Sequence, residues 1–321
     1  MAKVLGLGNA LVDIMIQLPN DSTLERFSLK KGSMQLSERD FAEQINNATK
    51  DFEKSQSSGG SAANTIHGIA SLGGNAGYIG KVGNDEFGEF FSRDMKEHNI
   101  EPFLLKGSVD TGRAMAMISK DSERTFATYL GAAIELNDAD LANEQFKDYD
   151  ILHIEGYLAL NHELMLKAAE LSRANNMKIS IDMASFNVVE DNLEFLKKYV
   201  KNHVDIIFAN EEESKAFTGK EPEDSLNELA EQCEIAIVKI GKKGSLVKSE
   251  GKIYKIDPIE VKPVDTTGAG DLFASGFLYG LTNNMPLDKC GQIGSLCAGK
   301  VIEIIGTKMS EEVWDFIKSK L

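Results

Sequence analysis

Residues 265–271 read Asp-Thr-Thr-Gly-Ala-Gly-Asp and lead directly into the apolar run Leu-Phe-Ala-Ser-Gly-Phe-Leu at residues 272–278. Two glycines separated by one residue leave backbone N–H groups free to face a ligand. A helix that begins there adds the positive end of its dipole. The stretch therefore predicts an anion site, suited to phosphate, formed by the backbone of Gly268, Ala269 and Gly270.

Asp271 lies beside this expected anion site, where a carboxylate would repel the ligand. One interpretation is that Asp271 caps an ordinary buried helix, because Asp is a common N-cap residue. The other is that it takes a proton from a hydroxyl group, which then attacks the bound phosphate. Taken alone, the four residues Gly-Ala-Gly-Asp leave both interpretations open.

The chain has 321 residues, with 50 Asp and Glu against 35 Lys and Arg, and a formal net charge of −15. This length is compatible with one large α/β domain spanning residues 1–321. The negative charge argues against binding to nucleic acid or to an anionic membrane, whereas a small phosphate ligand responds to local dipoles. No apolar run is long enough to span a membrane, and the N-terminal residues lack a secretion signal.

The three cysteines, Cys233, Cys290 and Cys297, form an odd and widely spaced set that is typical of reduced thiols. We therefore expect a cytoplasmic protein. The five histidines have no zinc-binding spacing, and no catalytic-triad pattern is present.

The second half of the chain predicts a parallel sheet. Continuous apolar runs at residues 151–154, 178–182, 204–209 and 235–240 are separated by helical stretches, a pattern typical of βαβ units buried on both faces. Ligands of such sheets bind beyond the carboxyl ends of the strands. The polar and glycine residues that follow these strands are Glu155, Asp182, Asn210 with Glu213, and residues 241–244.

The first half predicts a small separate sheet. Residues 12–36 and 101–131 are strand-like, in large part with alternating polarity, and such a sheet could cover a ligand as a lid. Between these segments, Gly59 and Gly60 precede a helix that carries Asn64, an arrangement that permits close approach of a ligand. A flexible loop with a capping Asn explains the same residues. Asp13 is either an edge carboxylate facing water or an acceptor for sugar hydroxyls.

Two phosphate-binding patterns are incomplete. Gly6-x-Gly8 follows a strand as in dinucleotide-binding folds, but Leu11 stands where the third glycine is needed. A nicotinamide-dependent oxidoreductase would rest on this pattern alone. Residues 294–300 have P-loop spacing, but Val301 replaces the metal-binding Ser or Thr, and the segment is predicted to lie inside a helix.

Together these segments resemble the PfkB family, the ribokinase-like sugar and nucleoside kinases. Residues 59–64 are similar to its N-terminal signature, residues 210–213 to its Asn-x-x-Glu block, and residues 265–271 match its C-terminal signature in full. The resemblance covers essentially the whole chain. It implies an α/β fold: a ribokinase-like parallel-sheet core with helices on both faces, plus a small β-sheet lid formed from about residues 12–36 and 101–131. It also implies phosphoryl transfer from ATP with Mg²⁺.

The resemblance implies a role for each matching residue. Asp271 would be the base, and the backbone of residues 268–270 would hold the transferring phosphoryl group. We expect a low pKa for Asp271 beside a helix N-terminus, which is tolerable because this transfer makes light demands on the base. The other implied roles are acceptor binding by Asp13, Gly59, Gly60 and Asn64; ATP binding by Asn210, Lys239, Gly241 and Gly244; Mg²⁺ binding through water by Glu213; and binding of a monovalent cation such as K⁺ by Asp265, Thr267 and Ser310.

The expected acceptor is a nucleoside, adenosine first, with a free sugar as the alternative. Ribokinases tend to have Lys where this chain has Ser61, and residues 28–34 and 123–132 resemble the adenosine-kinase-like branch. Phe126 or Tyr129 would then contact the base, and Arg113 would add a cation for phosphate or lid. A non-catalytic sensor on the same fold is the remaining alternative. An exposed lid edge could also pair two copies of the chain.

Overall fold

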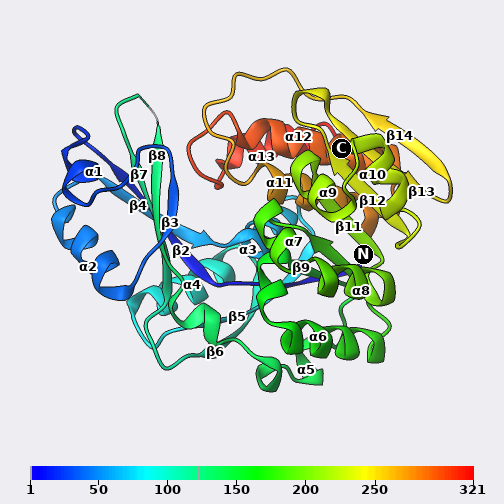
Figure 1. The fold of residues 1–321 in the computed structure, drawn as a ribbon, viewed down its shortest axis with the longest axis horizontal. Helices are drawn as coiled ribbons and strands as arrows, with labels where there is room; N and C mark the ends of the chain where they lie inside the picture. The colour runs from blue at the N-terminus through cyan, green and yellow to red at the C-terminus, as the bar shows by residue number, and fades with distance from the viewer. Residues whose placement is uncertain (1, 122) are drawn as a thin grey trace.

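The computed structural model describes residues 2–121 and 123–321, which form a larger and a smaller β-sheet with flanking helices (Figure 1). The larger sheet has the strand order β14-β13-β12-β11-β10-β9-β1-β5-β6. Its strands are β1 (Lys3–Leu7), β5 (Asn75–Val82), β6 (Ile100–Lys106), β9 (Ile151–Glu155), β10 (Lys178–Asp182), β11 (Ile206–Asn210), β12 (Ile235–Lys239), β13 (Ser245–Ser249) and β14 (Lys252–Ile256).

The parallel sheet predicted from the apolar runs is confirmed. Neighbouring strands pair in parallel from β12 through β11, β10, β9, β1 and β5 to β6, and β13 and β14 add an antiparallel hairpin at the β12 edge. Successive residues of one strand enter different cores: Val4 packs in one cluster and Leu5 in the other. Burial on both faces explains why these strands have continuous rather than alternating apolar sequence.

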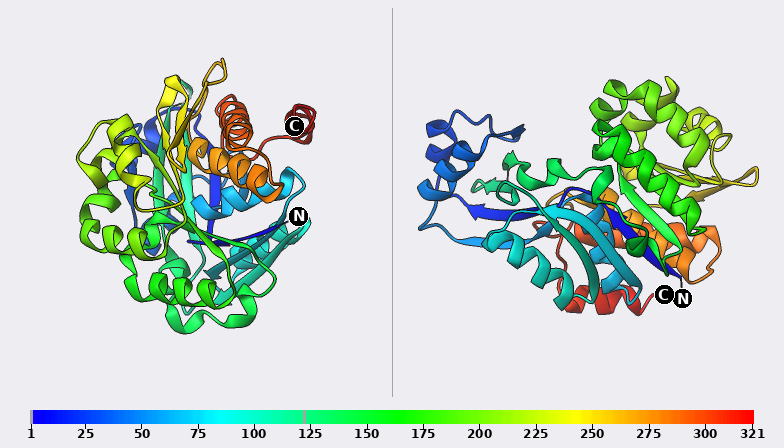
Figure 2. Two further views of the ribbon diagram at one scale, coloured as in Figure 1. Left: turned by 90° about the vertical axis from the view of Figure 1, so that its right-hand side faces the viewer. Right: turned by 90° about the horizontal axis from the view of Figure 1, so that it is seen from below.

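Helices cover both faces of the larger sheet, as the two further views show (Figure 2). On one face lie α3 (Ser61–Ser71), α4 (Glu86–Glu97), α11 (Ala269–Thr282) and α12 (Leu287–Val301). On the other face lie α6 (His162–Ala174), α8 (Leu193–His203) and α10 (Pro222–Leu229). Residues 294–300 lie inside α12, so the P-loop interpretation fails as expected.

The remaining helices connect these layers or flank the smaller sheet. They are α1 (Ser22–Arg26), α2 (Arg39–Ala48), α5 (Asn143–Phe146), α7 (Phe186–Asp191), α9 (Glu211–Thr218) and α13 (Glu311–Lys318), with short 3₁₀ turns η1 (Gly131–Glu135), η2 (Asp138–Asp140), η3 (Gly156–Leu160) and η4 (Gly241–Lys243). Of the helices in the described part of the chain, none combines the length and the apolar character needed to cross a membrane.

The predicted small sheet is present, with the order β3-β8-β7-β2-β4, and it lies beside the larger sheet (Figure 1). Its strands are β2 (Leu11–Gln17), β3 (Met34–Leu36), β4 (Lys54–Gly59), β7 (Gly112–Ile118) and β8 (Arg124–Tyr129). Two details differ from the expected segments. Residues 54–59 form a strand although they are mostly polar, because backbone pairing with β2 needs no apolar side chain. Residues 100–106 belong to the larger sheet, beside β5.

Candidate active site

The start of helix α11 has free backbone donors. Gly268 has φ of 73°, in the left-handed region that favours glycine. A Cβ atom on it would lie 2.5 Å from Thr307 Cγ2. Within residues 2–121 and 123–321, the N–H groups of Gly268 and Gly270 find no acceptor, whereas Ala269 N–H donates to Thr266 O at 3.3 Å. Two of the three predicted amides are therefore open to a ligand, and the third is held in a turn.

A lysine lies beside these amides. A Cβ atom on Gly270 would lie 3.0 Å from Lys239 Nζ, and the same Nζ lies 2.8 Å from Asp182 Oδ2. Burial lowers the pKa of Lys239, but Asp182 and Glu213 outweigh it, and the pKa is raised overall. A positive charge therefore accompanies the open helix start at neutral pH, which suits it to an anion.

The Asp271 carboxylate is held by the diglycine helix α3. Ser61 Oγ donates to Asp271 Oδ1 at 2.7 Å, and Asn64 Nδ2 donates to Oδ2 at 3.0 Å. Asn64 Oδ1 in turn accepts a hydrogen bond of 3.0 Å from Thr307 Oγ1, which fixes the amide orientation. A carboxylate oxygen has two lone pairs, so each oxygen of Asp271 can still accept one more hydrogen bond.

The expected low pKa of Asp271 is wrong. Burial raises its pKa to about 6, although the hydrogen bonds from Asn64 and Ser61 favour the ionised form. The nearby Asp182 raises it further, and Lys239 lowers it. The helix-dipole argument for a low pKa left out the loss of solvent around the carboxyl group, which is the largest contribution to the shift. A base with this pKa is ionised at neutral pH and is a better proton acceptor than an ordinary Asp.

The four predicted acceptor-binding residues come together. A Cβ atom on Gly59 would lie 2.3 Å from Asp13 Oδ2, so only glycine allows the Asp13 carboxylate to lie over β4. Gly60 has φ of 100° and caps α3, which carries Asn64. Burial raises the pKa of Asp13 to about 7; Lys308 and Arg124 oppose the shift, and Asp271 adds to it. Asp13 and Asp271 therefore interact electrostatically across one site.

Glu155 is a site residue that no motif assigned. It lies at the end of β9, is 1% exposed, and accepts hydrogen bonds from Asn9 N at 3.0 Å, Asn9 Nδ2 at 2.6 Å and Ala62 N at 3.0 Å. Gly8 also lacks space for a Cβ atom, which would lie 2.3 Å from Glu155 Oε2. Glu155 thus ties the β1 loop to the start of α3. The sequence feature that points to Glu155 is its position at the end of an apolar strand, where ligands of a parallel sheet bind.

The Asn-x-x-Glu block forms a closed capping box at the start of α9. Asn210 Oδ1 accepts from Glu213 N at 2.8 Å, and Glu213 accepts from Asn210 N and Nδ2, both at 2.7 Å. Burial raises the pKa of Glu213 to about 7, against the effect of Lys239. The box holds both side chains at the carboxyl edge of the sheet, beside Lys239 and Asp182.

Gly241 and Gly244 lie in the turn after β12. Both have positive φ, 53° and 91°. A Cβ atom on Gly244 would lie 1.9 Å from Ile256 O, so this glycine is required by packing against the β13–β14 hairpin. At Gly241 the nearest atom to such a Cβ is 3.8 Å away, which leaves its surface open. A structural role is thus established for Gly244, and an ATP contact stays a prediction for both.

From the smaller sheet, Arg124 contacts the segment 265–271, whereas Arg113, the residue expected to add a cation, does not lie there. Arg124 reaches from β8 of the small sheet, forms an ion pair with Asp265 and donates to Thr267 Oγ1 at 3.2 Å. Arg113 is instead buried between aromatic rings, 5.2 Å from the Phe87 centroid and 5.6 Å from that of Tyr129. Alternating polarity predicts that both arginines lie on strands. It does not predict which of the two side chains points toward residues 265–271.

The three predicted monovalent-cation ligands are not gathered around an open site. Asp265 Oδ1 accepts from Thr267 N at 3.0 Å, and Oδ2 accepts from Gly306 N at 3.0 Å and from Arg124. Ser310 is exposed at the start of α13, and it is not among the hydrogen-bond partners of Asp265 in the described part of the chain. A cation at Asp265 would have to compete with these donors.

Comparisons with known proteins show the family of the chain. The model of the pfkB family of carbohydrate kinases matches residues 33–314. Among solved structures, a probable sugar kinase from Rhizobium etli CFN 42 is 34% identical with a TM-score of 0.88, covering 99% of this chain and 98% of its own. The adenosine kinase from Sinorhizobium meliloti is 33% identical with a TM-score of 0.87, covering 100% of this chain and 99% of its own.

A curated relative from Clostridium beijerinckii, a 5-dehydro-2-deoxygluconokinase, is 31% identical over 265 residues, which are 76% of this chain and 78% of the relative. These relatives share the kinase name and differ in the acceptor that they are named for. The family match extends from the smaller sheet into the last helix, α13. The chain therefore belongs to the pfkB family of carbohydrate kinases, which are phosphotransferases that act on an alcohol group with ATP as co-substrate.

Proposed function

We propose that this protein transfers the γ-phosphoryl group of ATP to the primary hydroxyl of a nucleoside, with adenosine favoured. The observation that carries the proposal is the Asp271 carboxylate, fixed by Ser61 and Asn64 at the start of the helix whose amides are open. A base and an anion site thus meet at one point. Phosphoryl transfer needs little more from the protein than positioning and charge stabilisation.

In the proposed reaction, the acceptor hydroxyl lies against Asp271 and is oriented by Asp13 and Asn64. Its proton passes to an Asp271 carboxylate oxygen while its oxygen bonds to the γ-phosphorus. The bond from that phosphorus to the bridging oxygen breaks, and ADP leaves with the negative charge. The amides of Gly268 and Gly270 and the Lys239 ammonium stabilise the charge on the transferring group.

Mg²⁺ neutralises charge on the phosphates when it is bound. We propose that Glu213 and Asp182 hold it through water, since both carboxylates lie at the carboxyl edge of the sheet and Mg²⁺ retains its waters readily. Asn210 fixes the Glu213 carboxyl group, and Lys239 fixes Asp182. A monovalent cation such as K⁺ at Asp265 stays a prediction, and it would compete there with Arg124 for the Asp265 carboxylate.

The preference for a nucleoside rests on exposed apolar side chains near the end of β9. Tyr157 is 38% exposed, directly follows the Glu155-Gly156 pair, and interacts electrostatically with Asp271. Leu160, in the same turn, is 72% exposed. Such side chains suit a flat base. Tyr129, one of the two residues expected in this role, lies against Arg113 instead.

A sugar acid is the second candidate. Lys308 Nζ is buried without a hydrogen-bond partner among the described residues, and it interacts electrostatically with Asp13 at the acceptor end of the site. A buried ammonium group without a partner would favour an anionic or oxygen-rich acceptor. The Clostridium beijerinckii relative, by its name, acts on such a compound.

The deciding experiment is ADP release with Mg-ATP from a panel of adenosine, other nucleosides, ribose, fructose and 5-dehydro-2-deoxygluconate. We expect the highest kcat/KM with adenosine. The highest value with the sugar acid would select the second candidate, and no ADP release with any acceptor would favour a non-catalytic sensor. In the Asp271→Asn variant, we expect kcat to fall about 10²- to 10⁴-fold with unchanged ATP affinity; retained turnover would remove Asp271 from the base role.

Pairing of two chains through the small sheet belongs to the same proposal. Strand β3 lies at the sheet edge and exposes Met34 and Leu36, which are 58% and 64% accessible. An edge strand with apolar side chains is a ready surface for pairing. We expect a dimer in light scattering, and a monomer when both residues are changed to Lys.

A further inference from the structure

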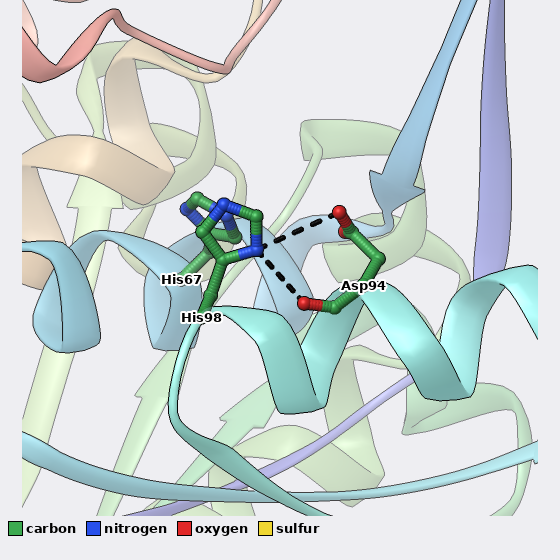
Figure 3. Close-up of side chains that lie close together, drawn as sticks. All are labelled: His67, Asp94 and His98. Atoms are coloured by element: carbon green, nitrogen blue, oxygen red, sulfur yellow. Dashed lines mark hydrogen bonds and ion pairs between the residues drawn. The ribbon is translucent and has the colours of Figure 1, made fainter.

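Three metal-ligating side chains that the proposed reaction does not use meet between helices α3 and α4: His67, Asp94 and His98 (Figure 3). One ligand atom from each residue lies within 4.8 Å of those from the other two. His67 belongs to α3, Asp94 to the last turn of α4, and His98 caps the end of α4. Asp94 and His98 are one helical turn apart, but the third member, His67, lies on another helix, so sequence spacing alone does not predict the cluster.

His67 has an orphaned ring nitrogen. The residue is 5% exposed, and its Nε2 has no hydrogen-bond partner in the described part of the chain. Its Nδ1 lies 3.4 Å from Ser71 Oγ, one turn along the same helix. A neutral imidazole with one nitrogen facing a polar partner and the other free is the metal-binding form.

The other two members are held in place around it. His98 Nδ1 lies 2.8 Å from Asp94 O and 3.5 Å from Asp94 Oδ1, and the rings of His98 and His67 are 4.1 Å apart between centroids. Asp94 Oδ2 accepts hydrogen bonds from Ser58, through its N–H at 3.2 Å and through its hydroxyl. Ser58 thereby orients the carboxylate, with Oδ1 toward His98 (Figure 3).

We propose that His67, Asp94 and His98 bind a divalent transition-metal ion of the Zn²⁺ class. Two imidazoles, one carboxylate and a water molecule are a common coordination set for Zn²⁺, with ligand atoms roughly 3.4 Å apart in a tetrahedron. The distance of 3.5 Å between His98 Nδ1 and Asp94 Oδ1 already matches this spacing, and the His98 side chain is 42% exposed at a helix end, which leaves it room to adjust toward His67. Mg²⁺ prefers oxygen ligands, so this site is distinct from the one that serves ATP.

Lys308 is the charged group that opposes a cation here. Its pKa is lowered to about 8 by burial, while Asp94, Asp13 and Asp271 attract its charge. A metal ion bound to Asp94 would neutralise one of the carboxylates that attract Lys308. The remaining attraction of Lys308 would then be to Asp13 and Asp271. Ser58, which holds Asp94, directly precedes Gly59 of the acceptor site. Metal binding would therefore change acceptor affinity, through the lysine and through β4.

The test uses the full-length protein without an affinity tag, stripped of metal by a chelator and free of nucleotide. Calorimetric titration with Zn²⁺ and absorption spectroscopy with Co²⁺ are expected to give about one ion per chain, with the visible bands of a tetrahedral site. The His98→Ala and Asp94→Asn variants are expected to bind at least about tenfold more weakly. The Lys308→Met variant is expected to bind more tightly, because it removes the opposing charge.

The matched control is His203→Ala, a histidine at the end of α8 that lies 3.2 Å from Arg173 and outside the cluster. It should bind like the parent protein. Circular dichroism of each variant verifies that it is folded. Absence of Zn²⁺ and Co²⁺ binding by the parent protein, or equal binding by parent and His98→Ala, would overturn the proposal. These readouts need no turnover, so they are independent of the proposed kinase reaction.

Discussion

Asn64 Nδ2 donates a hydrogen bond of 3.0 Å to Asp271 Oδ2, which joins the first turns of α3 and α11 across 207 positions of sequence. The diglycine segment and the C-terminal signature thus form one unit. The carboxylate proposed to accept a proton is positioned by the helix that follows Gly59 and Gly60, the glycines proposed to bind the acceptor. Acceptor binding and base strength are therefore linked through one amide side chain.

Replacing Asn64 by Leu should raise the pKa of Asp271, because the hydrogen bond from Asn64 favours the ionised carboxylate. The acidic limb of the kcat profile should move to higher pH by up to about one unit. The measurement is kcat against pH for both proteins at saturating acceptor. The Asn192→Ala variant, whose amide contacts Val188 O instead, should leave the limb in place. A limb that moves to lower pH in the Asn64→Leu protein would contradict this assignment.

The parent protein should lose activity on the acid side of neutrality. Burial raises the pKa of Asp271 to about 6 and that of Asp13 to about 7, so both are ionised above these values and protonated below them. A protonated Asp271 cannot accept the hydroxyl proton. We expect kcat/KM for the acceptor to fall as the pH drops through about 7 to about 6. Full activity retained well below pH 6 would show that neither carboxylate must be ionised.

Replacing Gly59 by Ala should damage acceptor binding selectively. The new Cβ would lie 2.3 Å from the Asp13 carboxylate, and that side chain must move away from its position. We expect KM for the acceptor to rise about tenfold or more, which corresponds to roughly 1.4 kcal/mol, with KM for ATP unchanged. Ser55→Ala, at an exposed position of the same strand, is the control. A rise in KM for ATP alone would place Gly59 at the nucleotide end.

Substitutions of Lys239 and Asp182 should have non-additive effects on the free energy of unfolding. The Asp182 side chain is 7% exposed and that of Lys239 is 15% exposed, so removal of one partner leaves the other charge in protein surroundings. We expect Lys239→Met to lower the free energy of unfolding by about 3 kcal/mol, and addition of Asp182→Asn to restore part of it. Urea denaturation of the single and double variants measures this cycle.

The exposed pair Lys178 and Glu234 is the comparison for that cycle, because its side chains are 50% and 48% exposed. Removal of this pair should cost less than about 1 kcal/mol. Additive effects of Lys239→Met and Asp182→Asn would mean that the two charges act independently. In that case the Lys239 ammonium would be available to interact with phosphate without being held by Asp182.

How far the sequence predicted the site depended on the range of the signal. The glycine-rich signature, the continuous strands and the helix after Gly59-Gly60 are local patterns; the strands and both helix starts are found as predicted, with two of the three signature amides free. Strand β4 was not predicted, because serines and a glutamine are not typical strand residues. The sequence predicts Arg113 and not Arg124 as the extra cation, because alternation within a strand does not predict which residue reaches a distant segment such as Asp265.

By itself the sequence determined the larger sheet, the smaller sheet and the open start of α11, since apolar periodicity and glycine placement act on neighbouring residues. Only the tertiary structure decided which carboxylates are buried together. That burial raises the pKa of Asp271, where a local helix-dipole argument expected a low value. It also brings His67 to Asp94 and His98, and Arg124 to Asp265, because contacts between distant elements depend on packing that no single segment encodes.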